Sequence, residues 1–164
     1  MSDSSSDSTS DFSSESTPIF RSDYFAFYPI TTRWMDNDIY GHVNNVTYYS
    51  YFDSAVNRYL IEEGGLDIQD APIVGYVVNS QCHYREPIAY PEKIEVGLRV
   101  NKLGNSSVTY GVAIFKEGHE QACAYGDFIH VFVDRAADKS VSIPPAIRRA
   151  LEKLDVNAQL EMTH

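Results

Sequence analysis

The sequence predicts an α+β domain in which one antiparallel sheet curls around a single long helix. Two observations carry this prediction: an apolar segment with helical spacing at residues 46–63, and four later segments of strand character with little helical signal between them. The helix is too apolar to lie exposed, so the sheet must wrap around it. We therefore expect a five-stranded antiparallel sheet, a long central helix and a short C-terminal helix.

The first strand and the long helix open the folded part. The stretch YFAFYPITTRWM, residues 24–35, has the aromatic and β-branched content of a strand. In the helix, Tyr49 and Tyr51 widen the apolar surface beyond one stripe, and Gly64-Gly65 supplies a stop. The residues that recur at helical spacing are Tyr48, Phe52, Ala55, Val56, Tyr59 and Leu60. This pattern predicts a helix surrounded by protein on much of its circumference.

Strand signals dominate the rest of the chain. Four strands are expected at residues 75–85, 93–103, 107–115 and 121–134. The second and third of these alternate apolar and polar residues, which predicts one buried face and one wet face. Short turns are expected at residues 103–106 and 117–120. Pro144-Pro145 then opens a short final helix, PPAIRRALEKL.

Length and composition favour one domain with a tail at each end. The chain has 164 residues, enough for a sizeable core. Residues 1 to about 20 are serine-rich and acidic, with no Lys or Arg before Arg21, and such a composition predicts a disordered tail. It resembles neither a signal peptide nor a mitochondrial presequence, so we expect a cytoplasmic protein. The folded domain is expected at residues 21–156, with a C-terminal tail at 157–164.

Charge and residue usage exclude several partners. The formal net charge of −10 argues against nucleic acid, and no apolar run approaches the roughly 18 residues of a membrane span. Cys82 and Cys123 fall inside predicted strands, and the five histidines show no metal-binding spacing. We therefore expect no metal and no cofactor. An open sheet edge and surplus aromatic residues predict a homodimer or homotetramer.

The most informative stretch is RWMDNDIYGHVNN, residues 33–45. Asp36, Asp38 and Gly41 match positions 1, 3 and 6 of a calcium loop, but Tyr40 and Thr47 stand where that loop needs oxygen ligands. No G-x-S-x-G elbow of a serine hydrolase occurs in the chain. The motif therefore predicts neither a calcium site nor a serine nucleophile.

What remains is a carboxylate just ahead of a helix. Asp38 precedes Asn45 by seven residues, and the helix that begins there offers unpaired N–H groups and a positive dipole end. Such a pair can polarise a carbonyl oxygen while the carboxylate attacks the carbon or activates water. Equally, Asp36, Asp38, Asn44 and Asn45 can cap the helix and turn the chain. The residues alone leave both interpretations open.

A family resemblance favours the catalytic interpretation. The run TRWMDNDIYGHVNNVTYYSYFDSAVNRYL resembles the 4-hydroxybenzoyl-CoA thioesterase-like family of hotdog-fold acyl-CoA thioesterases, in which an Asp-x-Asp-x-x-Gly segment leads into the central helix. The similarity continues through YREPIAYPEKIEVGLRV and PPAIRRAL, over nearly all of residues 24–154. It implies a hotdog fold and an acyl-CoA thioesterase that needs no metal.

The resemblance also implies roles for individual residues. Asp38 matches the catalytic carboxylate, and Gly41 to Asn45 match the loop and helix start whose N–H groups hold the thioester oxygen. Asp36 corresponds to loop structure, and Asp53 falls where the family often has an acidic residue. The remaining candidates for substrate contact are His42, Asn44 and Asn45 in the loop and helix start, with Gly75 and Tyr76 of a partner subunit lining the acyl pocket.

The acyl carrier is the open point of the resemblance. Relatives often place basic residues in the hairpin at 101–107 to meet coenzyme A phosphates, whereas this chain offers only Lys102 there, with Arg85 as a second candidate. An acyl-carrier-protein thioesterase and a non-catalytic acyl-CoA-binding module are therefore the alternatives to an acyl-CoA thioesterase. A hotdog hydratase is disfavoured, because DIYGHVNN does not reproduce its hydration motif.

Overall fold

A computed structural model describes residues 18–67 and 72–158 of the chain. Residues 1–17 of the expected N-terminal tail and residues 159–164 of the expected C-terminal tail lie outside the described residues. Next to them, Ile19 and Phe20 already pair through their backbones with Ala122 and Gln121. The described chain therefore begins against the loop that precedes the last long strand.

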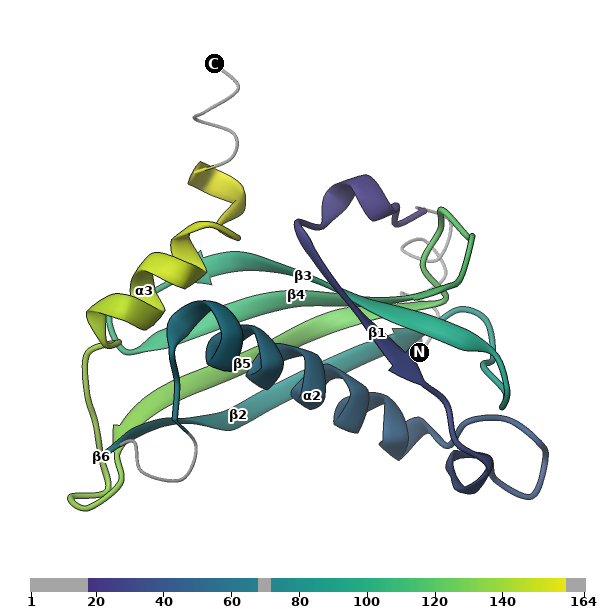
Figure 1. Cartoon of the computed structure of the whole chain (residues 1–164), viewed down its shortest axis with the longest axis horizontal. Coiled ribbons are helices and arrows are strands. Elements are labelled where there is room, and N and C mark those ends of the chain that lie inside the picture. The colour runs from purple at the N-terminus through teal and green to yellow at the C-terminus, as the bar shows by residue number, and fades with distance from the viewer. Residues whose placement is uncertain (1–17, 68–71, 159–164) are drawn as a thin grey trace, which may run out of the picture.

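The molecule is built on one antiparallel sheet of order β1-β3-β4-β5-β2 (Figure 1). Its strands are β1 (Ala26–Thr31), β2 (Ile73–Tyr84), β3 (Lys93–Leu103), β4 (Ser107–Lys116) and β5 (Ala124–Asp134). A two-residue strand, β6 (Lys139–Ser140), pairs with the end of β5. The predicted fold class, a curled five-stranded sheet with one long helix and a short C-terminal helix, is confirmed.

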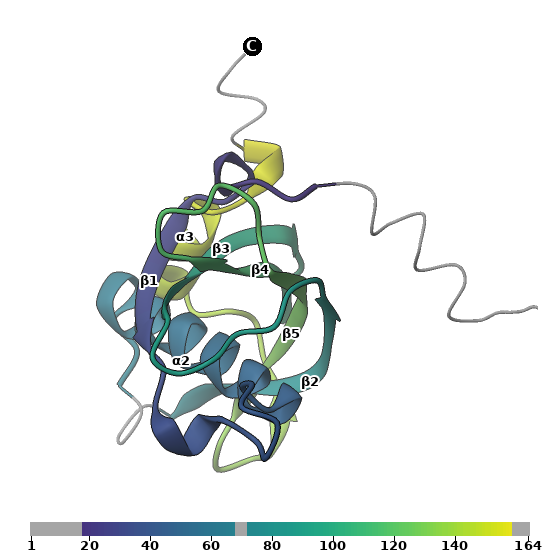
Figure 2. The same ribbon diagram turned by 90° about the vertical axis from the view of Figure 1, so that its right-hand side faces the viewer.

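Helix α2 (Asn45–Gly64) crosses the concave face of the sheet, and the end-on view shows the strands curling around it (Figure 2). The side chain of Asn44 caps its first turn by accepting a hydrogen bond from the Val46 N–H. Gly65 ends it in the left-handed conformation, with φ of 70°. The predicted helix bounds are thus correct to within one residue, and the cap is Asn44, with Asn45 as the first helical residue.

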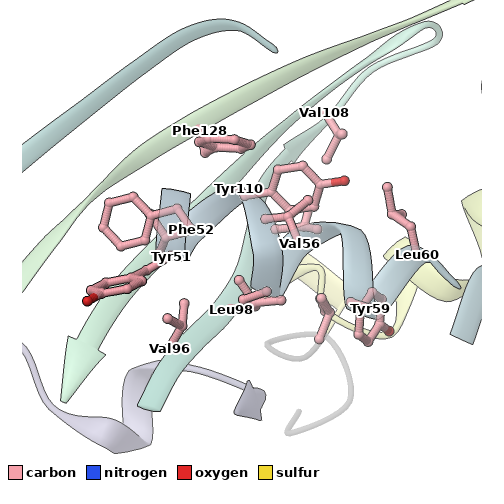
Figure 3. Packing of buried hydrophobic residues seen from close by; sticks show 14 of the residues in the cluster. Tyr51, Phe52, Val56, Tyr59, Leu60, Val96, Leu98, Val108, Tyr110 and Phe128 are labelled. Carbon is pink, nitrogen blue, oxygen red and sulfur yellow. The ribbon is translucent and has the colours of Figure 1, made fainter. Parts of the chain in front are cut away.

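The core fills the space between α2 and the sheet. Aromatic and aliphatic side chains of the helix interdigitate with inward-facing residues of β3, β4 and β5 (Figure 3). Helix α3 (Pro145–Glu152) closes one end of this core with Ile147, Ala150 and Leu151. Tyr59 ties the two helices together, because its hydroxyl donates to the Ala150 carbonyl at 2.5 Å.

The first strand is shorter than its composition suggests. We expected it to run to Met35, but β1 ends at Thr31, opposite the first residue of β3, Lys93. Beyond that point the ladder has no partner, and Trp34–Asp36 forms a 3-10 turn instead. The turn is held by Asp36, whose carboxylate accepts the Arg33 N–H at 2.9 Å.

Strand β2 forms an open edge of the sheet. It pairs with β5 on one side only, and Tyr76, Val77 and Val78 are 47%, 44% and 58% exposed. An edge of this length and hydrophobicity is a template for pairing with another chain. Among residues 18–67 and 72–158, no helix has the length and hydropathy that crossing a membrane requires.

Candidate active site

The loop between β1 and α2 presents Asp38 on the surface at the helix start. Oδ1 of Asp38 accepts the Tyr40 N–H at 2.8 Å and lies 3.4 Å from the His42 nitrogen. Its own N–H donates to the His42 carbonyl at 2.7 Å, and its carbonyl accepts the Gly41 N–H at 3.0 Å. The carboxylate is thus held by its own loop while its side chain stays open to solvent.

Gly41 gives this loop its tight shape. Its φ of 83° lies in the left-handed region, which a residue with a side chain adopts only at a cost. The turn allows Asn37 and Val43 to pair as an isolated bridge, which closes the loop at its base. The chain then enters α2 through the Asn44 cap.

Asp36 anchors the loop to the helix. Its side chain is buried and accepts hydrogen bonds from the Tyr51 hydroxyl at 2.7 Å and from the Arg33 guanidinium at 3.0 Å. Burial by itself would raise the pKa of this carboxyl, but the bonds from Tyr51 and Arg33 outweigh it, so the pKa of Asp36 lies below its usual value. Its carbonyl also accepts the Asn44 N–H at 2.9 Å.

The start of α2 carries an unused hydrogen-bond donor. The Val46 N–H is capped by the Asn44 side chain, and the Thr47 N–H donates to the Asn44 carbonyl. For the Asn45 N–H, by contrast, the described part of the chain provides no hydrogen-bond acceptor. This donor lies at the positive end of a 20-residue helix, where it can stabilise negative charge on an oxygen.

A pocket of about 320 Å³ brings several predicted residues together. Asp38, His42, Asn45 and Arg85 all line it, although Arg85 follows the others by some forty residues. Arg85 arrives from the end of β2, with its guanidinium 4.9 Å above the Tyr125 ring. The residues that complete the lining are Val43, Tyr48, Tyr84, Glu86 and Pro87.

Tyr84 and Glu86 are pocket residues that the sequence did not indicate. The Tyr84 hydroxyl donates to the Asn45 carbonyl at 3.3 Å, and its ring meets Tyr48 edge to face with centroids 4.9 Å apart. Desolvation raises the pKa of the Tyr84 hydroxyl, so it stays protonated at neutral pH. Both residues are recognised as pocket residues only by their proximity to Asp38 in space, and no local sequence pattern encodes that proximity.

Three other predicted residues lie away from this pocket within one chain. Gly75 and Tyr76 sit near the start of β2, whereas the pocket adjoins its end at Tyr84. Lys102 is exposed near the end of β3. Because β3 begins close to the Asp38 loop and rises about 3.3 Å per residue, Lys102 lies about 30 Å along the strand from that end.

Asp53 lies on α2 outside the pocket lining. Its carboxylate accepts the Asn57 side-chain amide at 3.0 Å. The hydrogen bond from Asn57 favours the ionised form of Asp53, but desolvation outweighs it, so the pKa of Asp53 lies above its usual value. No group of three or more His, Cys, Asp or Glu side chains is arranged to hold a metal ion in the ranges 18–67 and 72–158.

Comparison with known proteins identifies the family. Residues 32–151 match the model of the Thioesterase-like superfamily, and the chain belongs to this family. Its fold is the hotdog fold of the 4-hydroxybenzoyl-CoA thioesterase-like proteins, as the resemblance implied.

Two solved structures and one curated relative illustrate the similarity. The crystal structure of the PA5185 protein from Pseudomonas aeruginosa strain PAO1 is 57% identical, with a TM-score of 0.84 over 87% of this chain and 100% of that one. A thioesterase from Thermus thermophilus, complexed with coenzyme A and Zn, is 27% identical, with a TM-score of 0.67 over 82% of this chain and 94% of that one. The long-chain acyl-CoA thioesterase FadM of Escherichia coli strain K12 is 24% identical over 76% of this chain and 96% of its own length.

Proposed function

We propose that this protein hydrolyses an acyl-CoA thioester to a free acid and coenzyme A. One observation carries the proposal: Asp38, an exposed carboxylate, and Asn45, whose N–H is an unused donor at the helix start, line the same pocket. A thioester needs a nucleophile or base at its carbonyl carbon and a donor at its carbonyl oxygen, and these two groups supply both.

In the proposed reaction the thioester oxygen accepts a hydrogen bond from the Asn45 N–H. Asp38 then either attacks the carbonyl carbon, forming an anhydride that water hydrolyses, or takes a proton from an attacking water. In both routes negative charge develops on the thioester oxygen and is stabilised at the helix start. The departing thiolate of coenzyme A takes up a proton to complete the reaction.

Orientation of the loop is the role we assign to the residues around Asp38. Gly41 gives the turn its shape, and Asn44 caps the helix. His42 lines the pocket, and we assign it to substrate contact. Because the Tyr84 hydroxyl binds the Asn45 carbonyl, it fixes the peptide unit next to the proposed oxyanion donor.

The working form in this proposal is a homodimer or homotetramer built through β2. This strand is an open edge with exposed Tyr76 and Val78. Antiparallel pairing of two copies about a two-fold axis puts the start of one strand beside the end of the other. Gly75 and Tyr76 of one subunit would then approach Tyr84 of its partner, which agrees with a role in lining the partner's acyl pocket.

Coenzyme A is the carrier we favour over an acyl-carrier protein. An acidic carrier protein would meet a chain of net charge −10, which disfavours the encounter. The Escherichia coli relative acts on long-chain acyl-CoA and the Thermus thermophilus relative binds coenzyme A, which supports the same choice. Arg85, which lines the pocket, and Lys102, which would have to come from another subunit, remain the proposed contacts for the phosphates.

Released thiol, measured over a panel of acyl-CoA thioesters, tests the proposal. The panel should include aliphatic and aromatic acyl groups, with an acyl-carrier-protein thioester in direct competition. We expect turnover of at least one acyl-CoA by the wild-type protein. No thiol release from any thioester would support the non-catalytic binding module, and preference for the carrier-protein thioester would support the carrier-protein thioesterase.

A further inference from the structure

The connection between β2 and β3, residues 85–92, runs beside the loop that carries Asp38. Where this loop begins, the Thr32 hydroxyl donates to the Glu92 carbonyl at 2.6 Å, and Thr32 is buried. The loop is therefore attached to the connection before it reaches the 3-10 turn.

Asn37 supplies a second attachment in the middle of the loop. Its Oδ1 accepts the Tyr90 N–H at 3.0 Å. Where the loop ends, the Val43 N–H donates to the Ile88 carbonyl at 2.6 Å. The residue directly before Asp38 thus has its own side-chain bond to the connection, in addition to the bonds at the two ends of the loop.

Asn37 also joins a buried carboxylate to an exposed one. Asp36 is buried and bound to α2 through Tyr51, whereas Asp38 is open to solvent. The backbone of Asn37 is extended, with φ of −75° and ψ of 143°. Rotation about either of these bonds would swing Asp38 relative to the helix. The bond to Tyr90 opposes this rotation, because it ties the Asn37 side chain to a separate segment of the chain.

The other contacts of Asp38 do not perform this task. Its Oδ1 accepts the Tyr40 N–H, and its N–H donates to the His42 carbonyl. These bonds stay within residues 38–42, so they shape the turn and leave its orientation to the residues at its base. In the proposed reaction that orientation matters, because a displacement of about 1 Å between Asp38 and the Asn45 N–H can cost roughly 10² in rate.

We propose that Asn37 is a positioning residue for Asp38. The inference rests on the proposed thioesterase function and adds that the bond between Asn37 and Tyr90 sets the orientation of the carboxylate toward the Asn45 N–H. Asn37 itself does not touch the reacting atoms and acts through Asp38.

The first test compares kcat and KM of three variants on one acyl-CoA. Asn37→Ala removes the acceptor and should lower kcat about tenfold while KM changes by less than about twofold, because the carboxylate is misplaced and the binding surface is kept. Asn37→Asp retains an oxygen in place of Oδ1 and should recover most of the lost kcat at pH 8, where both neighbouring carboxylates are ionised. Asn101→Ala, which removes an amide from β3 away from this loop, is the matched control and should keep the wild-type kcat.

A double variant shows whether Asn37 acts through Asp38. In protein that carries Asp38→Asn, adding Asn37→Ala should cause no further loss of the residual kcat, because the group to be positioned is already absent. A further loss of about tenfold would mean that Asn37 supports another group or the fold as a whole, and would overturn the positioning role.

Trp34 is the single tryptophan of the chain and reports on the same attachment. Its ring meets the Tyr90 ring edge to face, with centroids 6.1 Å apart. In Asn37→Ala the time-resolved fluorescence anisotropy of Trp34 should show faster local motion than in wild-type protein, and Asn37→Asp should return it toward the wild-type decay. Identical decays in wild type and Asn37→Ala would show that the Asn37 bond does not hold the loop.

Failure of the positioning role is distinct from failure of the proposed function. If wild-type protein releases no thiol from any acyl-CoA, the proposed function fails and the positioning role fails with it. If wild-type protein is active and Asn37→Ala keeps its kcat, only the positioning role is overturned. The same holds if kcat falls in Asn37→Ala and Asn37→Asp does not restore it, because the retained acceptor should then have been sufficient.

Discussion

The Tyr51 hydroxyl donates a 2.7 Å hydrogen bond to Oδ2 of Asp36, and both side chains are buried. This contact joins the second turn of α2 to the 3-10 turn that precedes Asp38. The loop is therefore fastened at both ends, by Asp36 to the helix and by the Asn44 cap. The position of Asp38 depends on these attachments and on two bonds to the segment at 88–90, because the Val43 N–H donates to the Ile88 carbonyl at 2.6 Å and the Tyr90 N–H donates to Oδ1 of Asn37 at 3.0 Å.

Removing that hydroxyl should loosen the loop. Tyr51→Phe keeps the ring but leaves a buried carboxylate with one donor fewer, which should cost about 1–3 kcal/mol of the free energy of unfolding. Thioesterase turnover should fall as well, because Asp38 loses part of its support. Urea denaturation and kcat measured on the same sample give both quantities. Tyr28→Phe is the control, since Tyr28 lies on β1 with its ring beside Arg58 and away from Asp36. An equal loss of stability in both variants would contradict the anchoring role.

His130 should make stability depend on pH. It is 1% exposed among aromatic rings, and desolvation lowers the pKa of its imidazole from 6.5 to about 4. Between pH 6.5 and pH 4 the unfolded chain therefore binds a proton that the folded chain does not. The free energy of unfolding should fall as the pH is lowered through this window, by about 3 kcal/mol in total, and should be unaffected by His130 above it.

The measurement compares denaturant unfolding of wild-type protein and His130→Gln at pH 7.5, 6, 5 and 4. The difference between the two proteins should shrink as the pH falls, because the glutamine variant lacks the titrating group. His119→Gln changes an exposed histidine and should follow the wild-type curve. A constant difference between wild-type and His130→Gln across this range would show that His130 titrates normally in the folded state.

The Asn44 cap offers a third test. Asn44→Ala removes the acceptor of the Val46 N–H at the start of α2, at a typical cost of about 1 kcal/mol. Since the same turn carries the Asn45 N–H, kcat should fall more than KM changes. Asn44→Asp retains the capping oxygen and should recover most of the stability. Wild-type stability in Asn44→Ala would mean that the cap contributes nothing.

The dimer prediction is tested at the open edge. Val78→Lys places a charge in the middle of β2, where it should oppose strand pairing. We expect the wild-type protein to run as a dimer or tetramer by light scattering and the variant to shift toward monomer, with a parallel loss of thioesterase activity. His119→Lys adds the same charge to an exposed loop and should change neither. A wild-type protein that is a monomer at micromolar concentration would refute the assembly.

Local periodicity was enough to predict most of the fold. One face of each element packs against the core, and this places apolar residues at a regular spacing. The sequence therefore displays the alternation in β3 and β4 and the helical spacing from Tyr48 to Leu60. The predicted end of β1 was wrong. The strand ends at Thr31 because no ladder partner exists beyond Lys93, whatever the composition of TTRWM. The two-residue β6 was too short to leave a pattern.

The candidate site likewise contains residues that a local motif predicts and residues that only the tertiary structure brings in. Asp38, His42 and Asn45 lie within eight residues of one another, so one motif names them together. Tyr84 and Glu86 reach the pocket only because β2 returns beside the start of α2, and such tertiary contacts are absent from any local window. Lys102 carries the right charge for a phosphate contact, but within one chain the sheet puts it at the far end of β3.

The most direct test of the whole account is the turnover number of Asp38→Asn on the best acyl-CoA substrate. The variant keeps the size of the side chain and an acceptor for the Tyr40 N–H, so the fold and the dimer should be intact. We predict that kcat falls by a factor of roughly 10² or more, as expected when the nucleophile or base is removed. Asp127→Asn, an exposed carboxylate on the sheet, should retain wild-type kcat. Wild-type turnover in a folded, dimeric Asp38→Asn protein would contradict the assignment of Asp38 as the catalytic carboxylate.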